Sequence, residues 1–514
     1  MIIERKKNAV RNIVWGFGER IIGLLLPFLT RTVMIKELGV EYLGLNSLFT
    51  SILSVLSISE LGMGTAIVFS MYRPIAENDT KTLCALLNYY KKIYHVIGTV
   101  ILFGGLALLP FLPGLIHGTY PNNINLSVLY LIFLFNTVIS YYMFAYKSSL
   151  FNAFQRKDLV SKRTAIVNIL GDILKIIVLI FLKNYYAYAI LIPLSTIVTN
   201  LLTAFIAKKY FPNIQCVGNI TKEMSAGIKK RVVGLFSFKI YGVVFTSVDT
   251  IVISAFLGLT PLAIYNNYYY VQSVLVGFLT IFTSSVTAGI GNKMVTNNVD
   301  DNYDDFKRIV FLNGWIVSWC SVCMFCLYQS FMILWVGKEL CFPFFTMVLM
   351  VLYFLIPRIT TIAYTYREAA GLWWEDRFRP LIAAIVNLSL NLFLVKFIGM
   401  NGVLISTLFC SIFINIPVGA IILFNNYFKR SPMEYFMLII YYLLITVFVG
   451  GITYLICLLI PDYGLVSFII KIGICFILPN ILFVILYRKR ILFLYAKSLV
   501  QFYAKSAFAR LNKN

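Results

Sequence analysis

The sequence predicts an all-α protein that crosses a membrane about fourteen times. The composition is the first reason, because 60% of the residues are hydrophobic, only 13% are charged, and the mean hydropathy is +0.85. The second is the length of the apolar runs, since a helix needs about 20 residues to span a bilayer. The third is that lysines and arginines gather in alternate loops. A soluble globular protein is therefore excluded.

Each predicted span is an apolar segment of suitable length. The segments are 12–34, 43–70, 93–116, 125–146, 164–182, 186–207, 232–257, 262–290, 309–336, 342–366, 380–398, 401–425, 435–460 and 464–487. Their even number places both termini on the same side of the membrane.

The basic residues orient these helices, because lysine and arginine are retained in the cytoplasm. With the N-terminus inside, 34 of the 44 basic residues fall in cytoplasmic segments and five in outer loops. The net charge of +23 therefore follows from the topology and requires no nucleic-acid partner. The tail after residue 487 pairs lysines with apolar residues at helical spacing and is expected to lie on the inner leaflet.

An internal repeat indicates two related halves. The stretch KELGVEYLGLNSLFTSIL (36–53) aligns with AFLGLTPLAIYNNYYYVQ (255–272), and the same offset places Arg20 over Lys239. An offset of six helices gives both halves the same orientation, so we expect pseudo-two-fold symmetry of the parallel kind. The predicted domains are an N-terminal six-helix lobe (1–210), a C-terminal six-helix lobe (211–430), helices 13 and 14 (431–487) and a basic amphipathic cytoplasmic tail (488–514).

Two stretches carry a resemblance to a known family. The segment from KELGVEYLGLNSL to NYYKKIY (36–94) and SVDTIVISAFLGLTPLAIYNNYYYVQSV (247–274) resemble bacterial polysaccharide flippases of the Wzx type. These flippases belong to the multidrug/oligosaccharidyl-lipid/polysaccharide exporter superfamily. Fourteen spans and a repeat of six, six and two helices fit that superfamily along the whole chain.

The resemblance implies a function. It implies a flippase that moves undecaprenyl-diphosphate-linked oligosaccharide repeat units from the inner to the outer leaflet by alternating access. The products would serve cell-surface polysaccharide biosynthesis, as capsule or as the O-antigen of lipopolysaccharide. It also implies a multi-pass protein of the bacterial plasma membrane with cytoplasmic termini. Its partners would be membrane lipids and the polysaccharide polymerase machinery, with no nucleic acid.

Four basic residues within or next to the spans are candidates for binding the diphosphate: Arg20, Arg31, Lys239 and Arg358. A charge at the bilayer centre costs roughly 2.5–3.5 kcal/mol, so it should face protein or water. Arginine also binds phosphate oxygens in a bidentate manner. The alternatives are that Glu19 and Asp249 neutralise these cations, that Arg31 reaches the outer headgroups, and that Arg358 lies near the inner interface.

Three carboxylates are candidates for coupling transport to H⁺ or Na⁺. Asp249 is the first, in an otherwise apolar helix, and Glu60 in SISELGMG is the second. Both could equally be structural partners of the arginines in the first helix. Asp172 is the third, but Lys175 lies three residues later on the same helix face, which favours an internal ion pair.

Other classes of function find little support in the sequence. A multidrug or cation antiporter of the same fold is the alternative, although the basic residues argue against cationic cargo. The outer loops are too short for an extracellular polymerase, so we expect no enzyme and no catalytic residues. Cys320, Cys323 and Cys326 are spaced like part of an iron–sulfur motif, but they lie within a helix without a fourth nearby cysteine. We therefore expect no metal and no cofactor besides the coupling ion.

Overall fold

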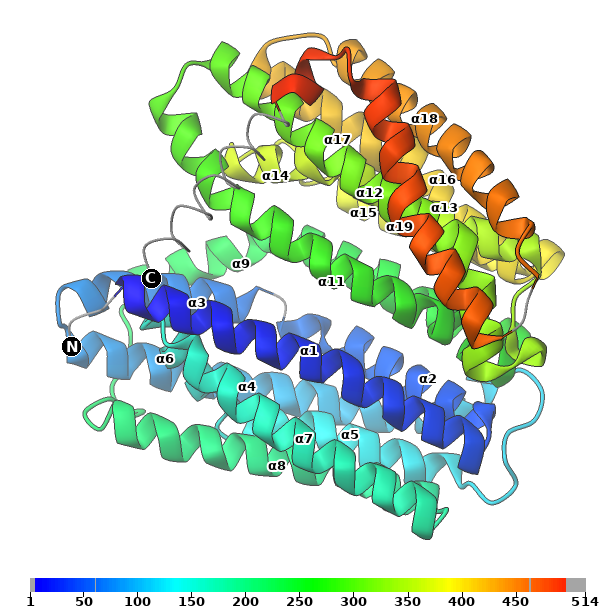
Figure 1. Ribbon diagram of the computed structural model, residues 1–514. Coiled ribbons are helices and arrows are strands. Elements are labelled where there is room, and N and C mark those ends of the chain that lie inside the picture. The colour runs from blue at the N-terminus through cyan, green and yellow to red at the C-terminus, as the bar shows by residue number, and fades with distance from the viewer. Residues whose placement is uncertain (1–4, 61, 462–463, 496–514) are drawn as a thin grey trace, which may run out of the picture. The chain divides into compact units, whose positions relative to one another are not determined.

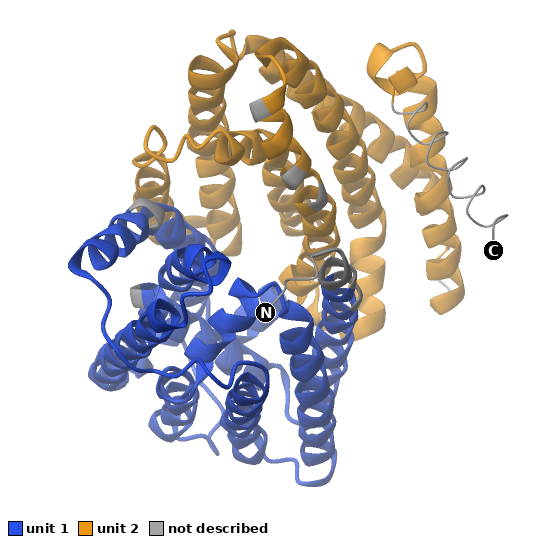
Figure 2. Cartoon of the chain, turned by 90° about the vertical axis from the view of Figure 1, so that its left-hand side faces the viewer, with its two compact units in different colours: residues 1–266 blue, residues 267–514 orange. Residues whose placement is uncertain are grey.

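The computed structural model describes residues 5–60, 62–461 and 464–495 (Figure 1). All regular elements within these ranges are helices, so the predicted all-α fold class is confirmed. The chain divides into two compact units, residues 1–266 and 267–514, which are coloured separately in Figure 2.

The first unit is built around long helices that pack side by side. Its elements are α1 (Arg5–Glu37), α2 (Val40–Leu56), η1 (Ser57–Glu60), α3 (Met63–Ala76), α4 (Thr80–Leu108), η2 (Leu109–Leu115), α5 (Leu126–Tyr142), η3 (Ala145–Lys147), α6 (Ser148–Ala153), α7 (Lys157–Phe181), α8 (Tyr185–Tyr210), α9 (Lys222–Val243), the π-helical η4 (Val244–Val248) and α10 (Asp249–Leu257). Helix α1 packs along α7, and α8 packs against both α5 and α7.

The second unit has α12 at its centre. Its elements are α12 (Val299–Val336), η5 (Lys338–Leu340), α13 (Phe344–Ile359), α14 (Thr361–Ala369), α15 (Arg379–Ile398), α16 (Met400–Cys410), η6 (Ser411–Asn415), α17 (Ile416–Leu423), η7 (Phe424–Phe428), α18 (Met433–Leu458) and α19 (Leu465–Tyr487). Helix α11 (Leu259–Thr296) begins in the first unit and ends in the second. The helices α13, α18 and α19 all pack on α12, and α15 packs on α16.

Several helices begin at a side chain that caps the first backbone amide groups. The N-cap residues Asp79, Asn125, Asn184, Thr221 and Asn298 each accept a hydrogen bond from the amide three residues later. Such caps satisfy donors that have no partner inside the helix. The short polar segments between the apolar runs therefore determine where α4, α5, α8, α9 and α12 start.

The helices are those of a multi-pass membrane protein. In the described ranges, eleven helices are long and apolar enough to cross a membrane, or twelve if α5 and α6 form one bent span. All fourteen predicted segments fall on helices. The predicted span 43–70 is interrupted, however, because η1 follows α2 and Gly62 adopts a left-handed conformation with a φ of 88°. Glycine adopts this conformation without strain.

The two repeated stretches have the same local structure. Gly39 joins α1 to α2 with a φ of 115°, and Gly258 joins α10 to α11 with a φ of 93°. Arg20 and Lys239 precede these glycines by the same number of residues. The repeat therefore aligns two helix–turn–helix elements and places the two cations at the same sequence distance from their turns.

The contacts within the units bear on the domain organisation. Helix α10 packs on α2 and α9 packs on α3, so both belong to the first unit. Helices α18 and α19 pack on α12 as part of the second unit. The lobe boundaries at residues 210 and 430 remain predictions. Residues 496–514 of the predicted amphipathic tail lie outside the described residues.

Candidate functional site

Two of the predicted phosphate-binding residues are exposed cations of the first unit. Arg20 lies in α1 and Lys239 in α9, and the side chains of both are exposed. Within the described part of the chain, neither makes a hydrogen bond or an ion pair. Both charges are therefore available to a ligand or to water.

Glu19 does not serve as the main partner of its neighbour Arg20. Its carboxylate acts electrostatically on Arg163 of α7, which is only 7% exposed. The guanidinium of Arg163 also donates a hydrogen bond to the hydroxyl of Thr203 on α8. Glu19 thus helps to compensate a buried arginine where α1 packs along α7. Arg163 is not among the site residues predicted from the sequence.

Arg31 lies in the last two turns of α1 and is half-buried. Its Nη1 donates a hydrogen bond to the backbone carbonyl oxygen of Asn266 in α11, with a donor–acceptor distance of 3.4 Å. Arg31 also acts electrostatically on the hydroxyl of Tyr188 in α8. These contacts tie the guanidinium to the protein, so Arg31 is less available to a phosphate than Arg20.

Arg358 lies in the last turn of α13, one residue after Pro357. Its side chain is half-buried and, among the described residues, has no hydrogen bond or ion pair. Its carbonyl oxygen accepts a hydrogen bond of 3.0 Å from Asn313 on α12. A cation in the last turn of a helix is favoured by the helix dipole, so this position by itself accounts for a basic residue.

Glu60 is the predicted coupling residue with the best-defined surroundings. It lies in η1, where the second predicted span is interrupted. One carboxylate oxygen accepts a hydrogen bond from Tyr94 of α4 and the other accepts one from Tyr141 of α5, both at 2.5 Å. Tyr90 donates in turn to the hydroxyl of Tyr94 at 2.9 Å. The carboxylate is therefore fixed by neutral donors and, in the described part of the chain, has no arginine or lysine as a partner.

Glu60 lines a polar cavity of about 280 Å³ within the first unit. The other lining residues are Tyr94, Asn136, Thr137, Ser140, Tyr141, Ala145 and Thr196. Thr196 donates a hydrogen bond of 2.7 Å to the side-chain oxygen of Asn136. The cavity offers oxygen atoms from a carboxylate, an amide and several hydroxyls, which are the groups that a small hard cation or a hydrated proton would contact. These residues could not be grouped from the sequence, because they lie on different helices.

The other two candidate carboxylates are buried. Asp249 is the first residue of α10, follows the π-helical η4, and has no exposed surface. Asp172 on α7 forms an ion pair with Lys175, with 2.9 Å between carboxylate oxygen and Nζ. This pair is the internal one that the spacing of the two residues favoured. Asp172 is thus engaged by a fixed cation, unlike Glu60.

The second unit contains a buried cluster of charges that was not predicted from the sequence. Asp376, with no exposed surface, forms ion pairs with Arg367 at 2.5 Å and with Arg379 at 2.6 Å. Arg379 also donates a hydrogen bond of 2.6 Å to the side-chain oxygen of Asn415, and both guanidinium groups lie near the ring of Tyr364. The cluster ties the loop before α15 to α14 and to η6. All three charges are engaged with one another, so the cluster is structural.

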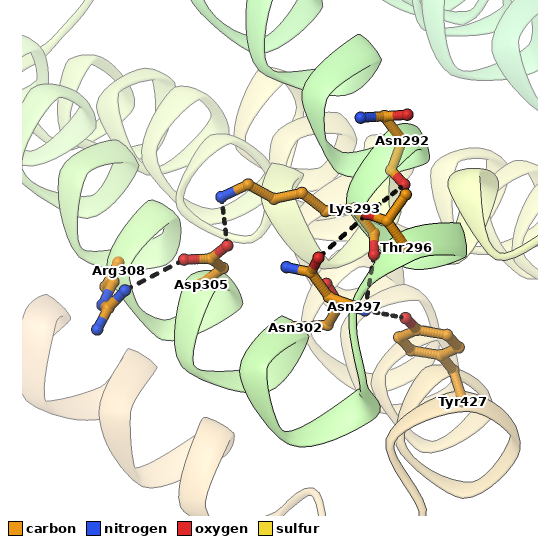
Figure 3. A network of polar contacts seen from close by, with 8 residues as sticks. All are labelled: Asn292, Lys293, Thr296, Asn297, Asn302, Asp305, Arg308 and Tyr427. Carbon is orange, nitrogen blue, oxygen red and sulfur yellow. Dashed lines mark hydrogen bonds and ion pairs between the residues drawn. The ribbon is translucent and has the colours of Figure 1, made fainter.

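The acidic segment NNVDDNYDDF at the start of α12 also has partners in the second unit. Figure 3 shows Asp305 between Lys293 of α11 and Arg308 of α12, with ion pairs to both. Asn302 donates hydrogen bonds to the carbonyl oxygen of Lys293 at 3.3 Å and to the hydroxyl of Tyr427 at 2.9 Å. The acidic residues therefore hold the turn between α11 and α12 in place by pairing with basic residues around it.

The comparisons with known proteins agree with this fold. A sequence profile of the family described as "Polysaccharide biosynthesis protein" matches residues 9–288, more than half of the chain. A comparison with curated proteins finds no match. The solved structure of the lipid II flippase MurJ in an inward closed conformation is similar, with a TM-score of 0.62 and 17% sequence identity. The alignment covers 92% of this chain and 98% of that chain.

Two MATE transporters are similar as well. An inward-facing MATE family transporter of the MOP superfamily has a TM-score of 0.56 at 13% identity, covering 77% of this chain and 92% of that one. A mutant of the Vibrio cholerae MATE transporter VcmN has a TM-score of 0.56 at 13% identity, covering 83% and 99%. At such identities the similarity shows the fold. Together with the family profile, it confirms the resemblance to flippases of this superfamily.

Proposed function

Because the chain belongs to the polysaccharide biosynthesis protein family, we propose that it is a flippase for lipid-linked oligosaccharides. Its substrate is an oligosaccharide repeat unit joined through diphosphate to undecaprenol. The protein moves this substrate from the inner to the outer leaflet of the bacterial plasma membrane by alternating access, for capsule or O-antigen synthesis. Both termini are cytoplasmic, as the distribution of 34 inner and five outer basic residues supports.

The observation that carries the proposal is that the side chains of Arg20 and Lys239 are exposed and have no partner among the described residues. An exposed, uncompensated cation in an apolar helix is costly unless water or a ligand surrounds it. These two cations occupy corresponding positions of the internal repeat and make no hydrogen bond or ion pair to the described residues. A diphosphate is the part of the substrate that most needs positive charge to cross an apolar layer. Arg31 and Arg358 would assist from the ends of α1 and α13.

Glu60 is the residue that we assign to ion coupling. A coupling carboxylate must be able to gain and lose its ion, which requires access and the absence of a permanent counter-charge. Glu60 lines a cavity and is held by two tyrosine hydroxyls. H⁺ or Na⁺ would bind there in one state of the transport cycle and leave in the other. Asp249 and Asp172 are the second and third candidates, because both are buried and Asp172 is paired with Lys175.

A multidrug or cation antiporter is the second candidate function. The observation that favours it is the same carboxylate-lined cavity, since an acidic group also attracts cationic cargo. Arg20 and Lys239 argue against it, because exposed cations would repel such cargo from the surface of the first unit. Either function is transport, and no chemical conversion of the substrate is proposed. Membrane lipids and the polysaccharide polymerase machinery are the proposed partners.

The test is transport by the purified full-length protein in liposomes. A fluorescent undecaprenyl-diphosphate oligosaccharide is incorporated, and its movement is followed by quenching with a reductant that cannot cross the bilayer. Matched samples contain the same glycan on a lipid without diphosphate, or a fluorescent cationic drug with an imposed H⁺ or Na⁺ gradient. We expect the diphosphate-linked glycan to flip and the other two cargoes to stay. Drug antiport without glycan flipping would establish the second candidate, and no flipping under any gradient would contradict the proposal.

A further inference from the structure

Three cysteine side chains of the second unit converge from three different helices. They are Cys326 of α12, Cys457 of α18 and Cys475 of α19. Their sulfur atoms all lie within 4.8 Å of one another, and those of Cys457 and Cys475 are 3.9 Å apart. The three residues are buried, with exposures of 6%, 3% and 0%. None of them takes part in the proposed transport site.

The spacing of the sulfur atoms matches a shared metal ion. A zinc–sulfur bond is about 2.3 Å long, so two thiolates on one ion lie roughly 3.8–4.0 Å apart in tetrahedral or trigonal geometry. The pair Cys457–Cys475 already has this separation. The third sulfur would have to move by less than about 1 Å to complete the set. We propose that Cys326, Cys457 and Cys475 bind one thiophilic divalent metal ion of the zinc type.

The charge of the surroundings selects a divalent ion. Lys471 lies one helical turn before Cys475 on α19, is buried, and acts electrostatically on Cys457. When the ion binds, the three thiols release three protons, and three thiolates with one divalent ion carry a net charge of −1. The ammonium group of Lys471 brings the total to zero, which matters because a net charge within apolar helices is costly. A monovalent ion would leave one negative charge without compensation.

The contacts of Cys323 show how the site is supported. Cys323 lies one turn before Cys326 on α12, and its thiol donates a hydrogen bond of 3.4 Å to the carbonyl oxygen of Cys475. This bond ties α19 to α12 beside the three sulfur atoms. The ion would be bound by one cysteine from each of three helices and would clamp α18 and α19 onto α12. The spacing of Cys320, Cys323 and Cys326 is not what forms the site, because only Cys326 points to the other two ligands.

The experiment uses the full-length protein, purified in detergent with reducing agent and stripped of metal with a chelator. Co²⁺ is the first probe, because thiolate ligation produces charge-transfer absorption in the near ultraviolet, and Zn²⁺ is then used to displace it. We expect one Co²⁺ per chain, displaced by one Zn²⁺. Cys326→Ser, Cys457→Ser and Cys475→Ser should each weaken binding at least tenfold. The control Cys410→Ser, which removes a buried thiol of α16 outside this set, should bind like the wild type.

Two results would overturn the proposal. One is a wild-type protein that shows no thiolate-to-cobalt band and binds less than a tenth of an equivalent of Zn²⁺, a result that does not depend on any variant folding. The other is binding that persists in the triple serine variant. An unfolding temperature that rises with Zn²⁺ in the wild type and in Cys410→Ser, but not in the triple variant, would support the clamp between α12, α18 and α19.

Discussion

Two pairs of basic residues differ in a way that separates a candidate binding charge from a structural one. In the first unit, Arg20 and Lys239 are exposed and have neither a hydrogen bond nor an ion pair with any described residue. In the second unit, Arg367 and Arg379 are buried and share the carboxylate of Asp376. The buried pair is compensated within the fold, whereas the exposed pair is compensated by none of the residues that the structure describes.

This difference shows how a functional or a structural role can be assigned to a charged residue. A cation within an apolar helix costs roughly 2.5–3.5 kcal/mol and needs protein or water around it. Arg367 and Arg379 lie instead at the ends of α14 and α15, where both are buried against Asp376 and stabilise the fold. Among the described residues Arg20 and Lys239 have no such partner, and they are therefore the two cations that we propose for binding the diphosphate.

The largest expected effect is the loss of the shared carboxylate. Asp376→Ala leaves two guanidinium groups buried without a counter-charge, so the free energy of unfolding should fall by about 3–5 kcal/mol. Thermal or denaturant unfolding of the purified protein in detergent measures this. The control is the exposed neighbour Glu375→Ala, which should unfold like the wild type. An Asp376→Ala protein of undiminished stability would show that the cluster is not structural.

Removal of Lys175 tests a pair that is also mostly buried. Lys175→Met leaves the carboxylate of Asp172 without its cation, which should cost about 1–3 kcal/mol of unfolding free energy. The double variant Asp172→Asn, Lys175→Met should recover part of this loss, as a double-mutant cycle would reveal. Flipping per folded molecule should not change. If flipping were lost while stability was retained, Asp172 would be the coupling residue instead of Glu60.

Glu60→Gln tests a carboxylate that, like Arg20 and Lys239, has no residue of opposite charge as a partner in the described part of the chain. Glutamine keeps the shape of the side chain but cannot change its charge, so gradient-driven flipping should fall about tenfold or more, equivalent to at least about 1.4 kcal/mol. The rate is measured with and without an imposed H⁺ or Na⁺ gradient. Glu77→Gln, at an exposed position, is the matched control. A response to the gradient that is unchanged in Glu60→Gln would exclude this residue from coupling.

The smallest expected effect concerns an ion pair on the surface of the protein. Arg73 and Glu77 lie 2.8 Å apart, but their side chains are 87% and 55% exposed. Exposed pairs of this kind contribute little, because water and salt screen them. Arg73→Ala should therefore change neither the unfolding temperature nor the flipping rate measurably. A clear loss of stability would mean that pairing matters here even without burial.

Much of the fold could be predicted from the sequence, because apolar runs in a membrane protein have to be helical. All fourteen predicted segments fall on helices, and the aligned glycines Gly39 and Gly258 both have positive φ. The interruption of the second span at η1 was not predicted. Its hydropathy continues through Gly62, whereas α2 ends at Leu56 and α3 begins only after the left-handed Gly62.

The residues of the candidate site could be predicted from the sequence, but the contacts between them could not. Hydropathy identifies Arg20, Lys239 and Glu60 as charges in unusual places. It cannot show that Glu60 is held by Tyr94 and Tyr141, or that Glu19 acts on Arg163, because the partners come from other helices. The three converging cysteines could not be predicted for the same reason.

The most direct test of the account is the flipping rate of the double variant Arg20→Ala, Lys239→Ala. Charge-assisted hydrogen bonds contribute about 1.5–3 kcal/mol each, so losing both should lower the rate for an undecaprenyl-diphosphate oligosaccharide by about a hundredfold or more. The charge-conserving variant Arg20→Lys, Lys239→Arg should keep most of the activity, and Lys209→Ala should resemble the wild type. A double alanine variant that unfolds at the wild-type temperature and flips the substrate at the wild-type rate would contradict the claim that these exposed cations carry the diphosphate.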